Sequence, residues 1–123
     1  EVYQLLVLGV LEEFGIHPQL NEIMINGQQN NHWVDYHKDC DCDAGISFVY
    51  HSNYEWKSEW GGTTEYIDPS TGKPVHIDYK PGRLIVMKGN LTHRGNPPSE
   101  MYRGLRTSVI IKTFKPSDDP YQF

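Results

Sequence analysis

The sequence has few cysteines, few basic residues and no long apolar run. The longest apolar stretch, from Leu5 to Leu11, is interrupted by Gly9 and is far shorter than the roughly 18 residues that a transmembrane helix requires. The 11 Lys and Arg residues are outnumbered by 16 Asp and Glu residues, so the chain lacks the positive field on which non-specific nucleic-acid binding depends. We therefore expect a soluble protein with no membrane partner and no bulk nucleic-acid binding.

The chain has only two cysteines, Cys40 and Cys42, with a single residue between them. A disulfide across so short a loop would be strained, and no second cysteine pair exists to complete a four-ligand zinc site. We therefore expect reduced thiols and a cytoplasmic location. The sequence starts at Glu1 without a methionine and shows no signal-peptide pattern, so we expect a processed or truncated N-terminus.

The length of 123 residues, with 37% hydrophobic and 22% charged residues, is typical of a single globular domain covering 1–123. Apolar residues near the start recur at helical spacing and predict one amphipathic helix that ends near Gly15 and Pro18. That stripe consists of Tyr3, Leu6, Val7, Val10, Leu11 and Phe14.

After this helix, short runs rich in Ile, Val, Tyr, Trp and Thr alternate with turn clusters, which predicts about eight β-strands. Eight short strands suit a jelly roll or barrel. We therefore expect an all-β core with one N-terminal helix packed on it. The expected strands are 20–26, 32–39, 46–52, 63–67, 74–79, 83–88, 91–95 and 105–114.

His37 and Asp39 lie two residues apart in the expected strand 32–39, so both side chains point to the same face. The natural third metal donor among the remaining histidines is His93, which follows the strand 83–88. Two histidines and one carboxylate form a facial triad that binds Fe(II) and leaves positions open for a chelating co-substrate and O₂. An isolated His-x-Asp, however, is often only a surface or hydrogen-bonded pair.

Arg106 lies in the expected strand 105–114 and shares a face with Ser108 and Ile110. A guanidinium that faces into a barrel is costly unless it pairs with an anion, and a dicarboxylic co-substrate supplies one in bidentate geometry. Arg103 is a rival for this role, but it precedes the β-rich run.

Several segments, taken in order, make the sequence resemble the Fe(II)/2-oxoglutarate-dependent oxygenases, in particular their prolyl 4-hydroxylase-like branch. The resemblance covers about 21–114. It depends on the His-x-Asp pair, a Gly-Gly-x-Thr-like segment, a Pro-x-x-Gly-Arg-Leu-like strand, the distal histidine and the Arg-x-Ser strand. The matching residues are 37–39, 46–56, 60–66, 80–87, His93 and 106–108.

The resemblance implies a double-stranded β-helix, or jelly roll, with the metal at its open end. It implies that His37, Asp39 and His93 bind Fe(II) and act in catalysis, and that Arg106 pairs with the distal carboxylate of 2-oxoglutarate. His51 and Ser108 are candidates for the same co-substrate pocket. A half-buried strand histidine and a core-lining serine are the alternative interpretations of these two residues.

The activity implied by the resemblance is hydroxylation of an unactivated C–H bond, coupled to conversion of 2-oxoglutarate and O₂ to succinate, with ascorbate as a further reductant. The expected substrate is a prolyl residue of a peptide or protein. A free amino acid or other small molecule, another side chain and a modified nucleobase are alternatives. The competing hypothesis is a jelly-roll module that binds metal or assembles with other subunits and has no oxygenase activity.

Trp56 and Trp60 lie in the segment 53–62, which ends in Gly61-Gly62. Aromatic contact groups next to a glycine hinge predict that part of this segment borders the substrate cleft. Trp60 is the preferred substrate contact, and we expect Trp56 to pack below the loop.

Overall fold

The computed structural model describes residues 19–41 and 45–114. In this part of the chain the regular structure is almost entirely β, with one 3₁₀ turn, η2 (Ser58–Trp60). The expected helix over 3–14 lies outside the described residues. The strands are β1 (Gln19–Gln28), β2 (Ile46–His51), β3 (Thr64–Ile67), β4 (Pro74–Ile77), β5 (Leu84–Lys88), β6 (His93–Gly95) and β7 (Arg106–Phe114).

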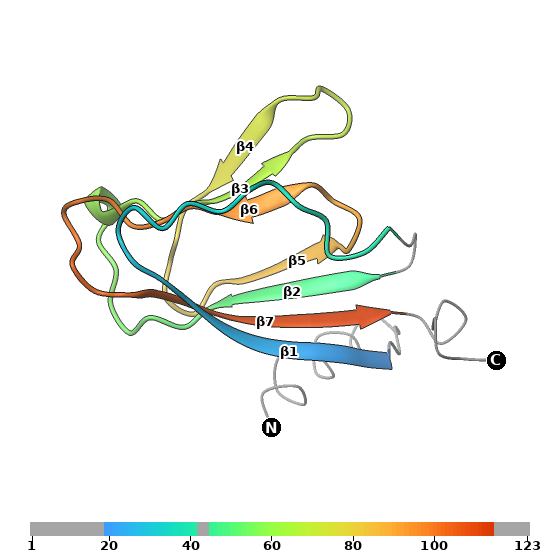
Figure 1. Ribbon diagram of the computed structural model, residues 1–123, viewed down its shortest axis with the longest axis horizontal. Helices are drawn as coiled ribbons and strands as arrows, with labels where there is room; N and C mark the ends of the chain where they lie inside the picture. The colour runs from blue at the N-terminus through green and yellow to red at the C-terminus, as the bar shows by residue number, and fades with distance from the viewer. Residues whose placement is uncertain (1–18, 42–44, 115–123) are drawn as a thin grey trace.

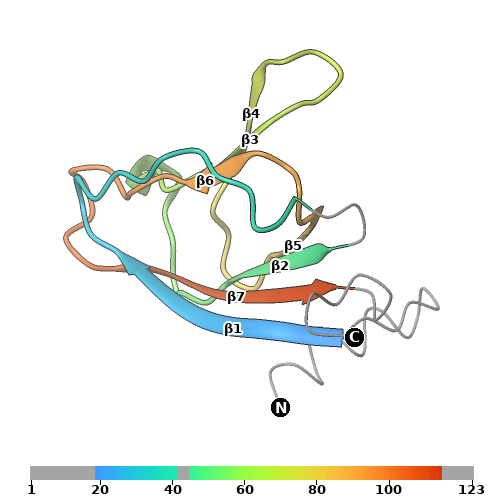
Figure 2. The same cartoon turned by 45° about the vertical axis from the view of Figure 1, so that its right-hand side comes forward.

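The strands form two antiparallel sheets that lie one above the other in Figure 1. The larger sheet has the strand order β1-β7-β2-β5, and the smaller has the order β4-β3-β6. Figure 2 shows the β3-β4 hairpin projecting away from the larger sheet. Because neighbours in each sheet come from distant parts of the sequence, as in the pairing of β1 with β7, the arrangement is consistent with a jelly-roll-like fold.

The larger sheet has an apolar cluster on each of its two faces. Phe48 and Ile111 are fully buried in one cluster, whereas Val49, Ile85 and Met87 form the other. Phe48 and Val49 are adjacent in β2, so the alternation of side chains along a strand directs them to opposite faces. The cluster with Val49 lies on the face that looks toward the smaller sheet.

Strand β7 presents alternate residues to the space between the sheets. Its inward-facing positions pair directly with alternate positions of β1: Asn26 with Ser108 and Gln28 with Arg106. The side chains at such paired positions lie next to each other on one face. The face shared by Arg106, Ser108 and Ile110 in the expected strand is therefore the face that looks into the fold.

The predicted strand 32–39 is wrong. This segment turns at Asn31, which has a positive φ of 67°, and makes only one isolated bridge, between His37 and His93. The amide groups of Asp39 and Cys40 both donate to the carbonyl oxygen of Gly89. Two donors on one acceptor replace the regular ladder of a strand, and in Figure 1 the segment crosses beside β6 as an irregular connection.

Cys40 is in a disulfide, which contradicts the expectation of a reduced thiol at this position. Cys42 lies outside the described residues. No helix in the described ranges is long and apolar enough to cross a membrane.

Candidate metal centre

The structure brings His37, Asp39 and His93 together, although the first two are more than fifty residues from the third in the sequence. One potential ligand atom from each residue lies within 4.8 Å of the other two. Asp39 Oδ1 lies 3.7 Å from His37 Nε2, and Asp39 Oδ2 lies 3.7 Å from His93 Nε2. The side chains of Asp39 and His93 are buried, whereas that of His37 is 49% exposed. One edge of the group is therefore open to solvent.

Backbone hydrogen bonds fix the relative positions of the two histidines. His37 and His93 each donate the amide N–H to the carbonyl oxygen of the other, at 3.0 Å in both directions. Their rings lie 4.6 Å apart, tilted by 55°. Asp39 follows two residues after His37 and is attached through its own N–H to Gly89 at 2.9 Å. These bonds join the His-x-Asp segment to β6 without a strand.

Both imidazole rings have a backbone acceptor at Nδ1. The carbonyl oxygen of Asp35 lies 3.0 Å from His37 Nδ1, and that of Leu91 lies 2.8 Å from His93 Nδ1. A carbonyl can only accept, so Nδ1 carries the proton and the Nε2 lone pair is left for a metal. Burial lowers the pKa of His93, which further favours the neutral, metal-binding imidazole.

The donors present match the set that a divalent iron site uses. Two imidazole nitrogens and one carboxylate face one another, and the exposed side of His37 leaves room for additional ligands. This is the composition of the two-histidine, one-carboxylate facial triad. The residues that the structure places here therefore fit Fe(II) or a similar divalent ion.

Arg106 forms a second polar centre between the sheets and is 3% exposed. Its Nε donates to the carbonyl oxygen of Gly62 at 2.7 Å. One terminal nitrogen, Nη1, donates to Gln28 Oε1 at 3.0 Å and to Ser108 Oγ at 3.3 Å. The other, Nη2, donates to Thr64 Oγ1 at 3.1 Å. The guanidinium is therefore oriented by neutral oxygen atoms.

The positive charge of Arg106 has no internal counter-ion in the part of the chain that the structure describes. Burial lowers the pKa of Arg106 to about 10, so the group is still charged at neutral pH. A buried cation without an anion is unfavourable. The arrangement therefore favours a ligand that brings a negative charge.

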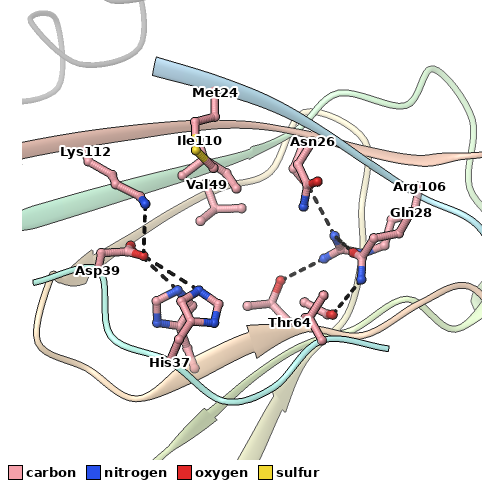
Figure 3. A pocket seen from close by; sticks show the side chains of 14 residues that line it. Met24, Asn26, Gln28, His37, Asp39, Val49, Thr64, Arg106, Ile110 and Lys112 are labelled. Atoms are coloured by element: carbon pink, nitrogen blue, oxygen red, sulfur yellow. Dashed lines mark hydrogen bonds and ion pairs between the residues drawn. The ribbon is translucent and has the colours of Figure 1, made fainter. Parts of the chain in front are cut away.

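One cavity of about 200 Å³ connects the two centres, as Figure 3 shows. Its volume is several times the roughly 30 Å³ that one water molecule occupies in the liquid. His37, Asp39 and His93 line one end, and Arg106 with Gln28 and Thr64 lines the other. The wall between them includes the apolar side chains of Val34, Met24, Val49 and Ile110.

Gly62 allows Arg106 and Trp56 to approach the backbone at the end of this cavity. Its φ is +70°, and a Cβ atom there would lie 2.8 Å from Trp56 Cζ2 and 3.1 Å from Arg106 Cδ. Both the backbone conformation and the lack of space exclude a side chain. The Gly-Gly segment noted in the sequence therefore has a steric reason at its second position.

Of the other residues proposed from the sequence, Ser108 lines the cavity, whereas Arg103 and His51 do not. Ser108 lines the cavity and contacts Arg106, whereas the rival Arg103 is exposed and lies in a separate depression with Glu100. His51 is fully buried, stacks on Tyr79 with ring centroids 4.1 Å apart, and does not line the cavity.

Trp60 is not among the residues that line the cavity. Its ring stacks on Tyr102, with centroids 4.4 Å apart, and meets Trp56 edge-on. This aromatic cluster holds the side chain in the loop region around η2. Trp60 is therefore not part of the lining of this cavity, and its expected role as a substrate contact stays a prediction.

Sequence reasoning did not identify Gln28, Thr64 or Lys112 as site residues. Lys112 could have been found, because the alternation that places Arg106, Ser108 and Ile110 on one face continues to it. Thr64 lies in the Gly-Gly segment that carried the resemblance. Gln28 gave no signal, since its role depends on the pairing of β1 with β7.

The fold is similar to that of a known hydroxylase. A crystal structure of a prolyl-4-hydroxylase from Pseudomonas putida matches with a TM-score of 0.62 and 19% sequence identity, over 88% of this chain and 55% of that one. The chain thus spans about half the length of that structure. At this identity the likeness shows the fold alone. No protein-family model and no curated protein matches the sequence.

Proposed function

We propose that this protein is an Fe(II)- and 2-oxoglutarate-dependent dioxygenase that hydroxylates an unactivated C–H bond. The observation that carries the proposal is the pairing of two centres in one cavity. A two-histidine, one-carboxylate group lies at one end, and a buried arginine lies at the other, with no counter-ion among the residues that the structure describes. A dicarboxylic acid that chelates a metal through one end needs a cationic partner for the carboxylate at its other end. The cavity offers these two functions together.

The roles of the residues follow from their positions. His37, Asp39 and His93 would hold Fe(II), and Arg106 would pair with the distal carboxylate of 2-oxoglutarate. Ser108 and Thr64, which accept hydrogen bonds from the guanidinium, would keep its fork directed into the cavity. When bound, the iron with 2-oxoglutarate and O₂ would supply the oxidising chemistry, in which 2-oxoglutarate becomes succinate and CO₂, one oxygen atom of O₂ enters succinate, and the other converts a C–H bond to C–OH.

The protein itself would contribute alignment and a dry environment. Met24, Val49 and Ile110 line the wall between the two centres, and their apolar side chains exclude water from the space that the co-substrate would fill. The exposed edge of His37 is the side from which a substrate could approach. A prolyl residue of a peptide or protein is the proposed substrate, supported by the likeness in fold to a prolyl-4-hydroxylase.

The test is succinate formation by the purified chain with Fe(II), 2-oxoglutarate, O₂ and ascorbate, with and without proline-containing peptides. We expect slow turnover without peptide and faster turnover with a peptide substrate, and we expect His93→Ala to abolish both. His76→Ala is the matched control, because His76 is a half-exposed histidine on β4 outside the cavity. Metal binding without any succinate would contradict the proposal and favour a metal-binding or assembly module.

A further inference from the structure

The carboxylate of Asp39 is the one member of the proposed metal triad whose direction is not set by its own segment. Each imidazole has a carbonyl oxygen two residues before it as the acceptor for Nδ1. Asp39 lies outside any strand, and its backbone amide donates to the carbonyl oxygen of Gly89. Its side chain is nevertheless 4% exposed. Something other than strand geometry must therefore orient this buried anion.

Two groups from the larger sheet contact the carboxylate, one at each oxygen. Ser47 Oγ donates to Asp39 Oδ2 at 2.6 Å, and Lys112 Nζ lies 3.7 Å from Asp39 Oδ1. Ser47 is 1% exposed, so its hydroxyl has no competing contact with solvent. Figure 3 shows the side chain of Lys112 extending from β7 toward Asp39.

Ser47 and Lys112 are direct cross-strand partners in the pairing of β2 with β7. Side chains at such positions lie next to each other on one face, so the sheet presents the hydroxyl and the ammonium as a fixed pair. On its other side Lys112 pairs with Glu22 of β1, whose Oε2 lies 3.7 Å from Nζ. Glu22, Lys112 and Ser47 thus form a row across β1, β7 and β2. Two of its members, Lys112 and Ser47, contact the carboxylate of Asp39.

We propose that Ser47 and Lys112 are positioning residues for the metal-binding carboxylate, an inference that rests on the proposed function. Because each oxygen of Asp39 has its own partner, rotation of the carboxylate would break at least one contact. The carboxylate is held with its oxygens facing the two Nε2 atoms before a metal arrives. The larger sheet thereby fixes the third ligand, while the smaller sheet, through β6, fixes one of the two histidines.

The sign of the effect on metal affinity separates positioning from simple electrostatics. Removing the charge of Lys112 reduces repulsion of a nearby cation, and removing the hydroxyl of Ser47 removes a donor that competes with the cation for the carboxylate oxygen. Both of these effects strengthen metal binding. Loss of an orienting partner of a ligand instead weakens metal binding, typically by 10–100-fold. Weaker metal binding after removal of either the Ser47 hydroxyl or the Lys112 charge would therefore be the result of lost positioning.

The experiment is a titration of the purified, chelator-treated chain with Mn(II), followed by calorimetry and by electron paramagnetic resonance. Ser47→Ala and Lys112→Met should each weaken Mn(II) binding by roughly tenfold or more and broaden the resonance of the bound ion. Ser47→Thr keeps a hydroxyl and Lys112→Arg keeps a cation, so each of these variants should retain most of the affinity for Mn(II). Melting curves in the presence of chelator show whether each variant is folded.

Matched controls are Ser52→Ala, whose hydroxyl bonds Thr107, and Lys88→Met, an exposed lysine on β5. Both should bind Mn(II) like the unmodified protein. Unchanged or tighter binding in folded Ser47→Ala and Lys112→Met would overturn the inference and leave the proposed function intact. Failure of the unmodified protein to bind Mn(II) would instead contradict the metal centre itself.

Discussion

The amide oxygen of Gln28 accepts a hydrogen bond from Arg106 at a position where a carboxylate would instead form an ion pair. Arg106 Nη1 donates to Gln28 Oε1 at 3.0 Å, and Gln28 Nε2 donates to the carbonyl oxygens of Gly95 and His32. Gln28 is 1% exposed. A neutral amide satisfies one donor of the guanidinium without compensating its charge, so within the described part of the chain the charge is available to the proposed anionic co-substrate.

Replacing Gln28 by glutamate should therefore weaken binding of the proposed co-substrate, because an internal anion would compete for Arg106. The new carboxylate would lie beside Arg106 and form the internal ion pair that the native site lacks, so 2-oxoglutarate would have to displace it. We expect the dissociation constant for 2-oxoglutarate, measured calorimetrically with Mn(II) bound, to rise at least tenfold, equivalent to about 1.4 kcal/mol. Mn(II) binding itself should change little, because Gln28 lies at the opposite end of the cavity from the triad.

The control for this experiment is Gln29→Glu, which adds the same charge at the neighbouring exposed position. It should leave 2-oxoglutarate affinity unchanged. Equal affinities in the Gln28→Glu variant and the unmodified protein would show that the charge of Arg106 does not recognise the co-substrate.

The choice between Arg106 and Arg103 gives a second prediction. Removing one partner of a buried charge pair costs roughly 2–5 kcal/mol, so Arg106→Ala should raise the KM for 2-oxoglutarate by about thirtyfold or more. Arg106→Lys should also be impaired, because an ammonium lacks the planar fork that pairs with a carboxylate at two points. Arg103→Ala should be nearly silent in the same succinate assay, since Arg103 is exposed and outside the cavity. The reverse ranking would exclude Arg106 as the carboxylate partner.

Much of the fold could be predicted because alternation along strands is a local signal. The runs that became β2, β3, β5 and β7 combine β-branched or aromatic residues with neighbouring turn residues, and each was found within a few positions of its expected place. The segment 32–39 also alternates, but among the described residues it makes an isolated bridge to β6, between His37 and His93, and not a continuous ladder. Alternation describes a residue's neighbours in sequence and does not reveal whether a pairing edge is available.

The residues of the candidate site were predictable where they differ chemically from the apolar residues that normally fill a protein core. A His-x-Asp pair, a distal histidine and an arginine inside an apolar strand all carry a cost of burial that points to a ligand. Ser47 and Gln28 could not be distinguished in this way, because a serine or glutamine on a strand is ordinary. Their contacts with Asp39 and Arg106 exist only through strand register. The surroundings of Trp60 could not be predicted either, because its contact with Tyr102 exists only in the tertiary structure.

The last prediction concerns His51, which is buried without reaching the cavity. Burial is the main cause that lowers its pKa to about 4, with contributions from the charges of Arg106 and Arg83. The ordinary histidine pKa of about 6.5 applies in the unfolded chain. Between these two values the unfolded state binds the proton more readily, so protons favour unfolding. The stability that neutral His51 provides is therefore present above pH 6.5 and is lost as the pH falls toward 4.

The expected loss is at most about 3 kcal/mol of unfolding free energy between pH 7 and pH 4. It can be measured by urea denaturation in the presence of chelator, comparing the unmodified protein with His51→Phe, which keeps a ring against Tyr79. The unfolding free energy of the unmodified protein, minus that of His51→Phe, should decrease by this amount toward low pH, because other groups titrate in both proteins and cancel. His51→Gln serves if the phenylalanine variant does not fold, and His32→Phe, at an exposed histidine, should retain the full pH dependence. Parallel curves for His51→Phe and the unmodified protein would mean that His51 accepts a proton as readily in the folded state as in the unfolded one.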